Sequence, residues 1–153
     1  MAKINIRKAV LSDLDRLLDF EQGVIRAERP FDSTLKSDLI HYYNISGMIE
    51  ADHVQLVVAE NEIALVGCGY ARIEKSQTFL VHSEYAYLGF MYVAEDYRGQ
   101  GINQLIVEAL KSWAISRGIT ELRLEVYKGN LAAISAYEKA GFEQHLIEMR
   151  MGL

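Results

Sequence analysis

The chain has very little cysteine and proline, with only Cys68 and Pro30 among its 153 residues. One cysteine excludes an internal disulfide framework and fits a reducing compartment. The cysteine and histidine spacing typical of a zinc site is also absent, so we expect no metal. No apolar run approaches the length of a membrane span, and no charged-then-apolar leader opens the chain. We therefore expect a cytoplasmic protein without a membrane partner.

An excess of basic residues is also lacking, since the net charge is −5. Without a clustered basic stripe we expect no nucleic-acid partner. The acidic balance is compatible with a cationic amine substrate, although surface carboxylates that keep the protein soluble are the simpler explanation. Half of the residues are hydrophobic, and no linker, repeat or low-complexity segment divides the chain. The prediction is a single domain over residues 1–153.

The most informative stretch joins an apolar strand-like run at 85–93 to an amphipathic helix. Apolar residues recur at helical spacing from Ile102 to Trp113, and Gly118 ends the pattern. Backbone N–H groups at a helix N-terminus attract anions, and glycines let an anion approach them closely. The stretch therefore predicts a phosphate cradle, which consists of Tyr97, Arg98, Gly99, Gln100, Gly101, Ile102 and Asn103.

Two common nucleotide-binding motifs do not fit this junction. No Lys-Ser or Lys-Thr pair follows Gly101, as a triphosphate-binding P-loop requires. The third glycine of a dinucleotide-binding fingerprint is missing as well.

A second pattern lies in residues 130–142. Asn130 is a suitable N-cap, Ala133 and Tyr137 then share one helix face, and Gly141 ends the helix.

Together the two segments resemble the GNAT superfamily of acyl-CoA-dependent N-acyltransferases. Its cofactor motif, Arg/Gln-x-x-Gly-x-Gly/Ala, falls on Arg98, Gly101 and position 103. Its Asn-x-x-Ala-x-x-x-Tyr-x-x-x-Gly-Phe signature matches residues 130–142 throughout. Asn103 departs from the motif. Its side chain would either crowd the pyrophosphate or donate an amide hydrogen bond to it.

The resemblance implies acetyl-CoA as cosubstrate and a gap between two central parallel strands that receives the pantetheine arm. It also implies a set of cofactor-binding residues. These are Met91, Tyr92 and Val93 through their backbone, then Arg98, Gly99, Gln100, Gly101, Ile102, Asn103, Asn130, Ala133 and Tyr137.

Periodicity along the chain predicts an α/β (α+β) fold. Its mixed, mostly antiparallel sheet has six to seven strands with helices on both faces. A capping box at Ser12 and Asp15 opens the first helix, which Arg29 and Pro30 break. The remaining expected elements are strands at 3–9, 55–60, 63–74, 85–93, 121–127 and 144–151, and helices at 35–49, from 101, and after 130.

The chemistry of acetyl transfer requires a neutral amine, and a lysine-like amine with a pKa of about 10.4 is mostly protonated at pH 7. Removing that proton costs roughly 4–5 kcal/mol, against about 1 for an α-amine near pKa 8. The departing thiolate needs a group that protonates it or donates a hydrogen bond to it, and the resemblance assigns that role to Tyr137.

The general base stays open between several residues. Glu125 matches a glutamate that is catalytic in protein N-terminal acetyltransferases of this superfamily, but it is equally explained as a structural strand residue. Glu84 and a chain of waters are alternatives. His82 and His41 have suitable pKa values but fit surface positions better.

The resemblance places the acceptor near the first two helices, where an acidic, aromatic pocket is possible: Glu21, Glu28, Asp32, His41, Tyr42 and Tyr43. We expect an N-acetyltransferase that acts on a primary amine of a small molecule or peptide, as a monomer or homodimer. A non-catalytic acyl-CoA-binding regulatory module is the alternative, and a structural dimerisation domain is a weaker one.

Overall fold

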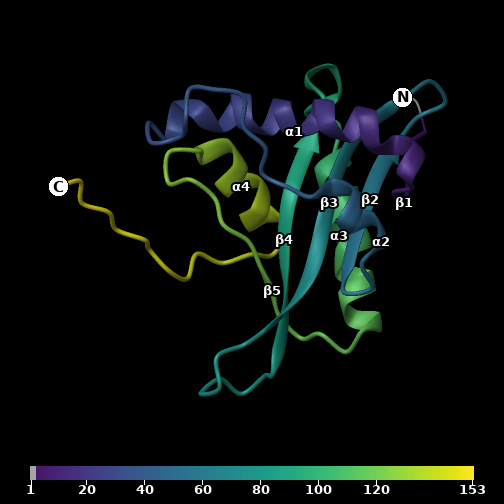
Figure 1. Ribbon diagram of the computed structural model, residues 1–153. Coiled ribbons are helices and arrows are strands. Elements are labelled where there is room, and N and C mark those ends of the chain that lie inside the picture. The colour runs from purple at the N-terminus through teal and green to yellow at the C-terminus, as the bar shows by residue number, and fades with distance from the viewer. Residues whose placement is uncertain (1–2) are drawn as a thin grey trace.

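The computed structural model describes residues 3–153 as a five-stranded sheet with helices on both faces (Figure 1). The strands are β1 (Asn5–Lys8), β2 (Val54–Glu60), β3 (Leu65–Lys75), β4 (Glu84–Val93) and β5 (Leu122–Arg123). The helices are α1 (Leu14–Glu28), α2 (Ile45–Glu50), α3 (Ile102–Ser116) and α4 (Leu131–Lys139), with 3₁₀ turns at Leu11–Asp13, Arg29–Phe31 and Glu95–Tyr97.

The strands lie in the sheet in the same order as in the chain. All neighbours are antiparallel except β4 and β5, which run parallel and are joined through α3. This confirms the predicted mixed, mostly antiparallel sheet with helices on both faces.

Each face of the sheet has its own apolar core. Leu56 and Val58 on β2 pack in the layer that contains α1 and α2, whereas Val57 and Ala59 pack in the layer that contains α3. Successive side chains of a strand point to opposite faces, so a strand covered on both sides is apolar without interruption. The run from Leu56 to Ala59 has this pattern.

The predicted count of six to seven strands is too high for the residues described. The expected strand at 121–127 pairs only at Leu122 and Arg123, because β5 then separates from β4 and its later residues have no neighbour. The expected strand at 144–151 is extended chain that joins no sheet.

The predicted helix over 35–49 is wrong, since only its end forms α2. The reason is Glu21, a fully buried residue of α1. Its carboxylate accepts the backbone N–H groups of Tyr42 and Tyr43, both at 2.9 Å. These donors are therefore not available to a helix, and Asn44 caps the short α2 that follows by accepting the N–H of Gly47.

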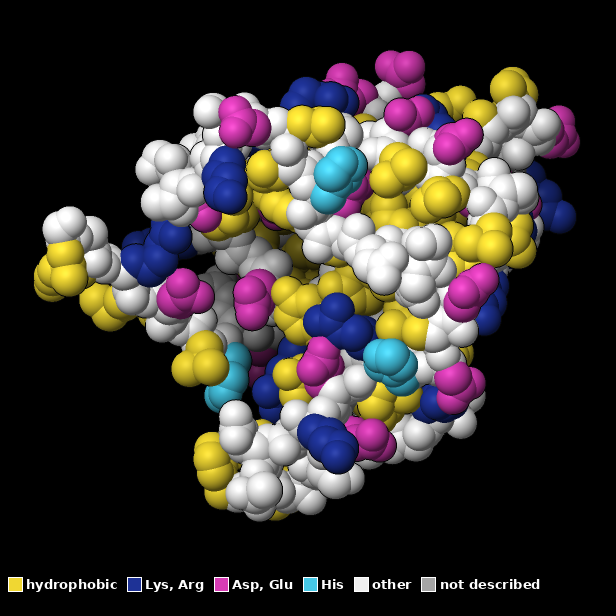
Figure 2. All heavy atoms as spheres, in the orientation of Figure 1, with side chains coloured by type: hydrophobic (Ala, Val, Ile, Leu, Met, Phe, Trp, Pro, Cys, Tyr) yellow, Lys and Arg dark blue, Asp and Glu magenta, His cyan; other side chains and the backbone are white. Residues whose placement is uncertain are grey.

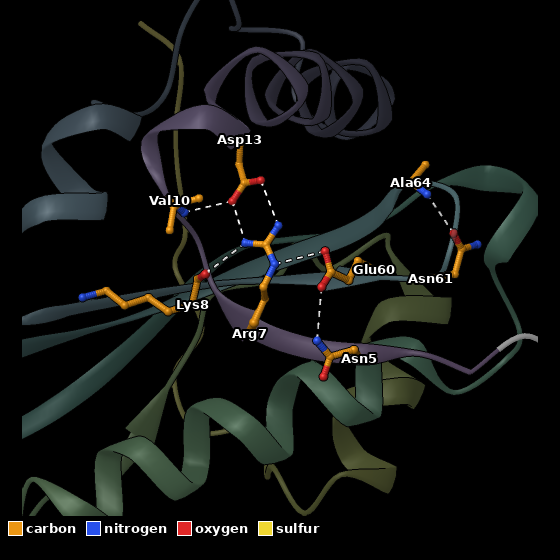
Figure 3. A network of polar contacts seen from close by, with 8 residues as sticks. All are labelled: Asn5, Arg7, Lys8, Val10, Asp13, Glu60, Asn61 and Ala64. Atoms are coloured by element: carbon orange, nitrogen blue, oxygen red, sulfur yellow. Dashed lines mark hydrogen bonds and ion pairs between the residues drawn. The ribbon is translucent and has the colours of Figure 1, made fainter.

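A polar network fixes the start of α1 and replaces the predicted capping box at Ser12 and Asp15 (Figure 3). The Asp13 carboxylate accepts the N–H of Val10 at 2.9 Å and two guanidinium bonds from Arg7 at 2.8 and 3.0 Å. Arg7 also donates through Nε to Glu60 at 3.0 Å. The network therefore ties β1, β2 and the entry to α1 together.

We predict that Asp13→Asn lowers the free energy of unfolding by about 2 kcal/mol at pH 7, because charge-assisted hydrogen bonds are lost. Arg7 and the Val10 N–H hold the pKa of Asp13 below its ordinary value. A depressed folded pKa gives stability that is present above the unfolded pKa and lost as pH falls through the folded pKa. The difference between wild type and variant should shrink below about pH 4, as measured by urea unfolding.

Asp19→Asn is the matched control on the same helix. Asp19 is 73 % exposed and lies 3.9 Å from Arg16, so its loss should change stability by less than about 0.5 kcal/mol. Equal effects of the two substitutions would show that the network around Asp13 contributes nothing.

Candidate active site

The predicted cradle lies between β4 and α3. Gly99 and Gly101 have φ of +75° and +78°, in the left-handed region that favours glycine, and Gly101 is the N-cap of α3. An added Cβ at either glycine would meet nothing within 4 Å, so the loop faces open space.

The N-terminus of α3 presents donors to that space. Within residues 3–153, no backbone acceptor pairs with the N–H groups of residues 99–104, and the first bond of the helix runs from Leu105 N–H to the Gly101 carbonyl. These N–H groups carry the positive end of the helix dipole. The Asn103 side chain lies in this first turn and is half-buried. The geometry suits a bound phosphate or pyrophosphate.

The strand before the cradle has a free edge. β4 pairs with β5 only at Ala86 and Tyr87, so the edge of β4 from Leu88 to Val93 has no strand beside it on this side. A bulge interrupts the pairing of β4 with β3 at Phe90, which has φ of +54°. A bulge inserts one residue and so reverses which way the following backbone groups point.

The bulge decides which backbone groups face the gap. Ala94 N–H donates to the Val66 carbonyl on β3 at 2.8 Å, so the alternating pattern turns Tyr92 toward β3 and turns Met91 and Val93 toward the gap. Two of the three predicted backbone contributors therefore face the gap. The Tyr92 ring instead packs 5.0 Å from Phe20 of α1.

Arg98 lies across the end of this gap. Its Nε donates to the Val93 carbonyl at 2.9 Å, and its guanidinium lies 5.7 Å from the centre of the Tyr92 ring. The side chain is exposed, which leaves its other donors accessible to an anion.

The second motif forms α4 as predicted. The Asn130 side chain accepts the Ala133 N–H at 3.2 Å, and Gly141 follows the helix with φ of +108°. Tyr137 is half-buried, and its ring meets Phe142 edge-on at 5.9 Å. Burial and then the charge of Glu28 raise the pKa of Tyr137 to about 12, so its hydroxyl keeps its proton at neutral pH.

Other tyrosines gather around the space next to the gap. The ring centre of Tyr43 lies 5.7 Å from that of Tyr42 and 5.9 Å from that of Tyr70. The ring centres of Tyr70 and Tyr87 are 6.4 Å apart. Tyr127 stacks on Phe31 at 6.1 Å, and its hydroxyl donates to Asp32 at 3.1 Å. We refer to these residues as the tyrosine cluster: Tyr42, Tyr43, Tyr70, Tyr87 and Tyr127.

Glu28, at the end of α1, is a carboxylate whose charge acts on most of these tyrosines. Burial is the main cause of the raised pKa values of these phenols, and the charge of Glu28 contributes at Tyr42, Tyr43, Tyr87, Tyr127 and Tyr137. Burial and the nearby charge of Asp32 raise the pKa of Glu28 itself. From the sequence Glu28 was one of several possible pocket residues, because its proximity to Tyr127 and Tyr137 depends on the tertiary fold.

The residues expected near the acceptor divide into two groups. Glu28, Asp32, Tyr42 and Tyr43 form one group, since the charge of Glu28 acts on both tyrosines and the charge of Asp32 acts on Glu28. Glu21 is instead buried behind it, where it accepts two backbone N–H groups and lies 2.6 Å from Nδ1 of His41. Glu21 and His41 therefore support the pocket wall.

The candidates for the base also separate in space. Glu125 is exposed beyond β5, and its charge acts on Tyr70 and Tyr87, on the side of the tyrosine cluster that faces β5. Glu84 begins β4, roughly 30 Å from Val93 for a strand of 10 residues. His82 is paired with Glu121 at 3.1 Å. The structure therefore brings Glu125 near the tyrosine cluster, at Tyr70 and Tyr87, and leaves Glu84 at the far end of β4 from the cradle.

The space-filling view shows a hollow on this face, between the arm formed by the C-terminal residues and the body of the molecule (Figure 2). No group of three or more metal-binding side chains occurs within residues 3–153. In the same part of the chain, no helix is both long and apolar enough to cross a membrane.

A mixed sheet that opens beside a glycine-rich helix N-terminus suits a ligand that combines an extended amide chain with a pyrophosphate. The sequence matches the acetyltransferase (GNAT) family over residues 15–142. The chain belongs to this family.

Individual relatives agree with this assignment. The uncharacterized N-acetyltransferase YobR of Bacillus subtilis is 40% identical over 65 residues, which are 42% of this chain but only 26% of YobR. A mutant of the BH1408 protein from Bacillus halodurans has the same fold, with a TM-score of 0.87 and 19% identity over 97% of this chain and 99% of that one. A predicted acetyltransferase from Clostridium acetobutylicum, solved with acetyl-CoA, gives a TM-score of 0.74 and 17% identity over 98% and 96%.

We predict that CoA stabilises the folded protein by about 2.7 kcal/mol at a hundredfold excess over its Kd, because the cradle exists only in the native state. Gly101→Ala should reduce this gain, since a Cβ at φ +78° forces the loop to shift. Thermal unfolding with and without CoA, together with calorimetric Kd values, measures the effect.

Gly118→Ala provides the control. Gly118 has the same φ of +78° and the same open surroundings, but it lies at the other end of α3. Both variants should lose similar stability without CoA, and only Gly101→Ala should lose affinity. Unchanged CoA affinity in both would contradict the cradle.

Proposed function

We propose that the protein is an N-acetyltransferase that transfers the acetyl group of acetyl-CoA to a primary amine of a small molecule or peptide by direct attack in a ternary complex. One observation carries the proposal. The gap beside β4 has an anion-binding helix terminus at one end and a cluster of tyrosines and carboxylates beside it.

The binding of acetyl-CoA, the acetyl donor, depends on backbone groups that have no partner in the fold. The N–H groups of residues 99–104 and the Arg98 guanidinium bind the pyrophosphate. Met91 and Val93 turn their backbone toward the gap, where an extended amide-containing arm adds hydrogen bonds as a further strand does. Asn130, Ala133 and Tyr137 border the opposite side through α4.

The acceptor side is suited to a cation. Tyrosine rings attract an ammonium group through their faces, and Glu28, Asp32 and Glu125 add negative charge around them. The raised pKa of Glu28 shows that its charge is poorly solvated. A cationic amine beside Glu28 offsets that cost, so the site favours substrates that carry positive charge.

The amine must lose a proton before it attacks the thioester. Glu125 remains the proposed base, acting directly or through water. Glu28 anchors the ammonium group of the amine, and the positive charge of that group offsets the cost of burying the Glu28 carboxylate. After the attack, Tyr137 donates a hydrogen bond to the departing sulfur. A phenol with a pKa of about 12 stabilises the thiolate as a hydrogen-bond donor more readily than it protonates it, because the corresponding thiol has a pKa of only about 8.5.

The basic test is release of free CoA thiol from acetyl-CoA across a panel of amines. Turnover with one class of amine supports the proposal. CoA binding without turnover on any amine would instead favour a regulatory acyl-CoA-binding module.

We predict that Tyr137→Phe lowers kcat about 10²-fold while the Kd for CoA stays near the wild-type value, because only the hydroxyl is removed. Tyr85→Phe is the control. Tyr85 lies under the Arg123 guanidinium at 3.9 Å near the start of β4, away from the cradle. An undiminished kcat in Tyr137→Phe would remove Tyr137 from the reaction.

We predict different defects for the two carboxylates. Glu125→Gln should lower kcat, recover in part at high pH where more amine is neutral, and affect a lysine-like acceptor more than an α-amine. Glu28→Gln should mainly raise the KM of cationic acceptors, because it removes the charge that holds them. The KM and kcat of each variant are measured across pH.

Glu108→Gln, an exposed change on α3, should alter neither quantity. A defect of Glu125→Gln that is independent of pH would assign Glu125 a structural role. An unchanged KM in Glu28→Gln would exclude Glu28 from amine binding.

A further inference from the structure

Arg72 on β3 places a positive charge inside the tyrosine cluster, and the proposed function does not use it. Its guanidinium lies 5.4 Å from the centre of the Tyr70 ring and 5.6 Å from the centre of the Tyr87 ring. Contact with the two rings holds the guanidinium in one place. The side chain is 36 % exposed, so it is partly desolvated but still accessible to a ligand.

The strand register shows how this guanidinium is held. Arg72 lies opposite Tyr87 on β4, and Glu74 lies opposite Tyr85, further from the cradle. Arg72 donates through Nε to Glu74, and its Nη1 lies 3.5 Å from the Tyr70 hydroxyl. In the part of the chain that the structure describes, Nη2 has no hydrogen-bond partner. Glu74 therefore orients the guanidinium through Nε and leaves the Nη groups for a ligand.

Negative charge lies on the other side of the same tyrosine. Burial raises the pKa of Tyr87, the charges of Glu125 and Glu28 raise it further, and the charge of Arg72 lowers it. Glu125 follows β5 on one side of β4, whereas Arg72 lies in β3 on the other side. Among the described residues, neither Glu28 nor Glu125 forms an ion pair. A ligand over Tyr87 therefore meets carboxylates on one side and guanidinium donors on the other.

A second arginine on this face is directed elsewhere. Arg123 lies opposite Tyr87 in the pairing of β4 with β5. Its Nε donates to Glu121 at 2.7 Å, and its guanidinium lies 3.9 Å from the centre of the Tyr85 ring. Tyr85 is two residues further from the cradle than Tyr87. Arg72 is thus the arginine of this pair that faces the tyrosine cluster.

We propose that the acceptor is an amine that also carries an anionic group, and that Arg72 binds this group while Glu28 and Glu125 face the amine. Arg72 repels a ligand that has only positive charge, whereas a zwitterion pairs with both sides of the site. Basic and acidic side chains lie next to each other on the body side of the hollow (Figure 2). Carboxylate and phosphate both accept parallel guanidinium hydrogen bonds. The inference rests on the proposed acetyl transfer and specifies its substrate class.

The experiment measures release of CoA thiol with primary amines that share one alkyl chain and differ at its far end. The acceptors are ε-aminocaproate, aminohexyl phosphate, the neutral aminohexanol and the dicationic hexamethylenediamine. The wild type should prefer the better anionic acceptor over aminohexanol by roughly 10- to 100-fold in kcat/KM, the range of a charge-assisted hydrogen bond. The diamine should be the poorest acceptor. The carboxylate and phosphate arms identify the anion that the site prefers.

Arg72→Gln should remove this preference, mainly by raising the KM of the anionic acceptors. Arg72→Lys keeps the charge without the planar fork, so it should give an intermediate preference. Arg117→Gln is the matched control. Arg117 also lies over a ring, 5.2 Å from the centre of Trp113, and pairs with Asp52 at 3.3 Å, but it follows α3 on the other face of the sheet. Its variant should keep the wild-type preference, and thermal unfolding shows that each variant is folded.

Calorimetry separates this inference from the proposed function. The Kd of the preferred anionic amine for the CoA-loaded protein should rise roughly 10- to 100-fold in Arg72→Gln. This binding does not require turnover. Absence of turnover with every amine would contradict acetyl transfer, whereas the Kd values still test Arg72.

Any of three results would overturn the role of Arg72. The first is a wild type that uses aminohexanol or the diamine as well as it uses both anionic amines. The second is an Arg72→Gln variant that keeps the preference and the Kd of the wild type. The third is a CoA-loaded wild type that binds neither anionic amine.

Discussion

The separation of two parallel strands is the constraint on which the remaining features of the site depend. β4 and β5 pair only at Ala86 and Tyr87, so most of β4 has an edge without a strand beside it. The bulge at Phe90 then turns Met91 and Val93 toward that edge. The cradle of α3 follows at the end of β4. A pairing that continued to Val93 would satisfy these backbone groups and leave an acyl donor no strand edge to join.

Two carboxylates of one helix show how burial and hydrogen bonding separate roles. Glu21 and Glu28 lie about two turns apart on α1. Glu21 is fully buried but accepts two backbone N–H groups and contacts His41, so its oxygens are satisfied. Its effect is to hold Tyr42 and Tyr43 in place. Glu28 is only half-buried, and its pKa is raised by that burial and by Asp32. A carboxylate in that state is suited to a cationic ligand, whereas Glu21 is suited to a structural role.

The elements set by local pattern agree with the sequence interpretation. The hairpin around Asn61, the strand β4, the helix α3 between its glycines and the capped helix α4 all lie where periodicity and capping residues predict them. The predictions that were wrong concern elements that depend on residues distant in the chain. The helix expected at 35–49 lost its donors to Glu21, and the start of α1 is fixed by Arg7 rather than by Ser12. Such contacts leave no periodic trace in the sequence.

The sequence by itself determined the family, the glycine cradle and the helix that carries Tyr137. It could do so because these features depend on residues close together in the chain, where turn conformation and capping are local. Only the tertiary structure decided which carboxylates border the tyrosine cluster and which backbone groups of β4 face the gap. Those outcomes depend on the separation of β4 from β5 and on the packing of α1 across the sheet, which bring together residues about a hundred positions apart, such as Asp32 and Tyr127.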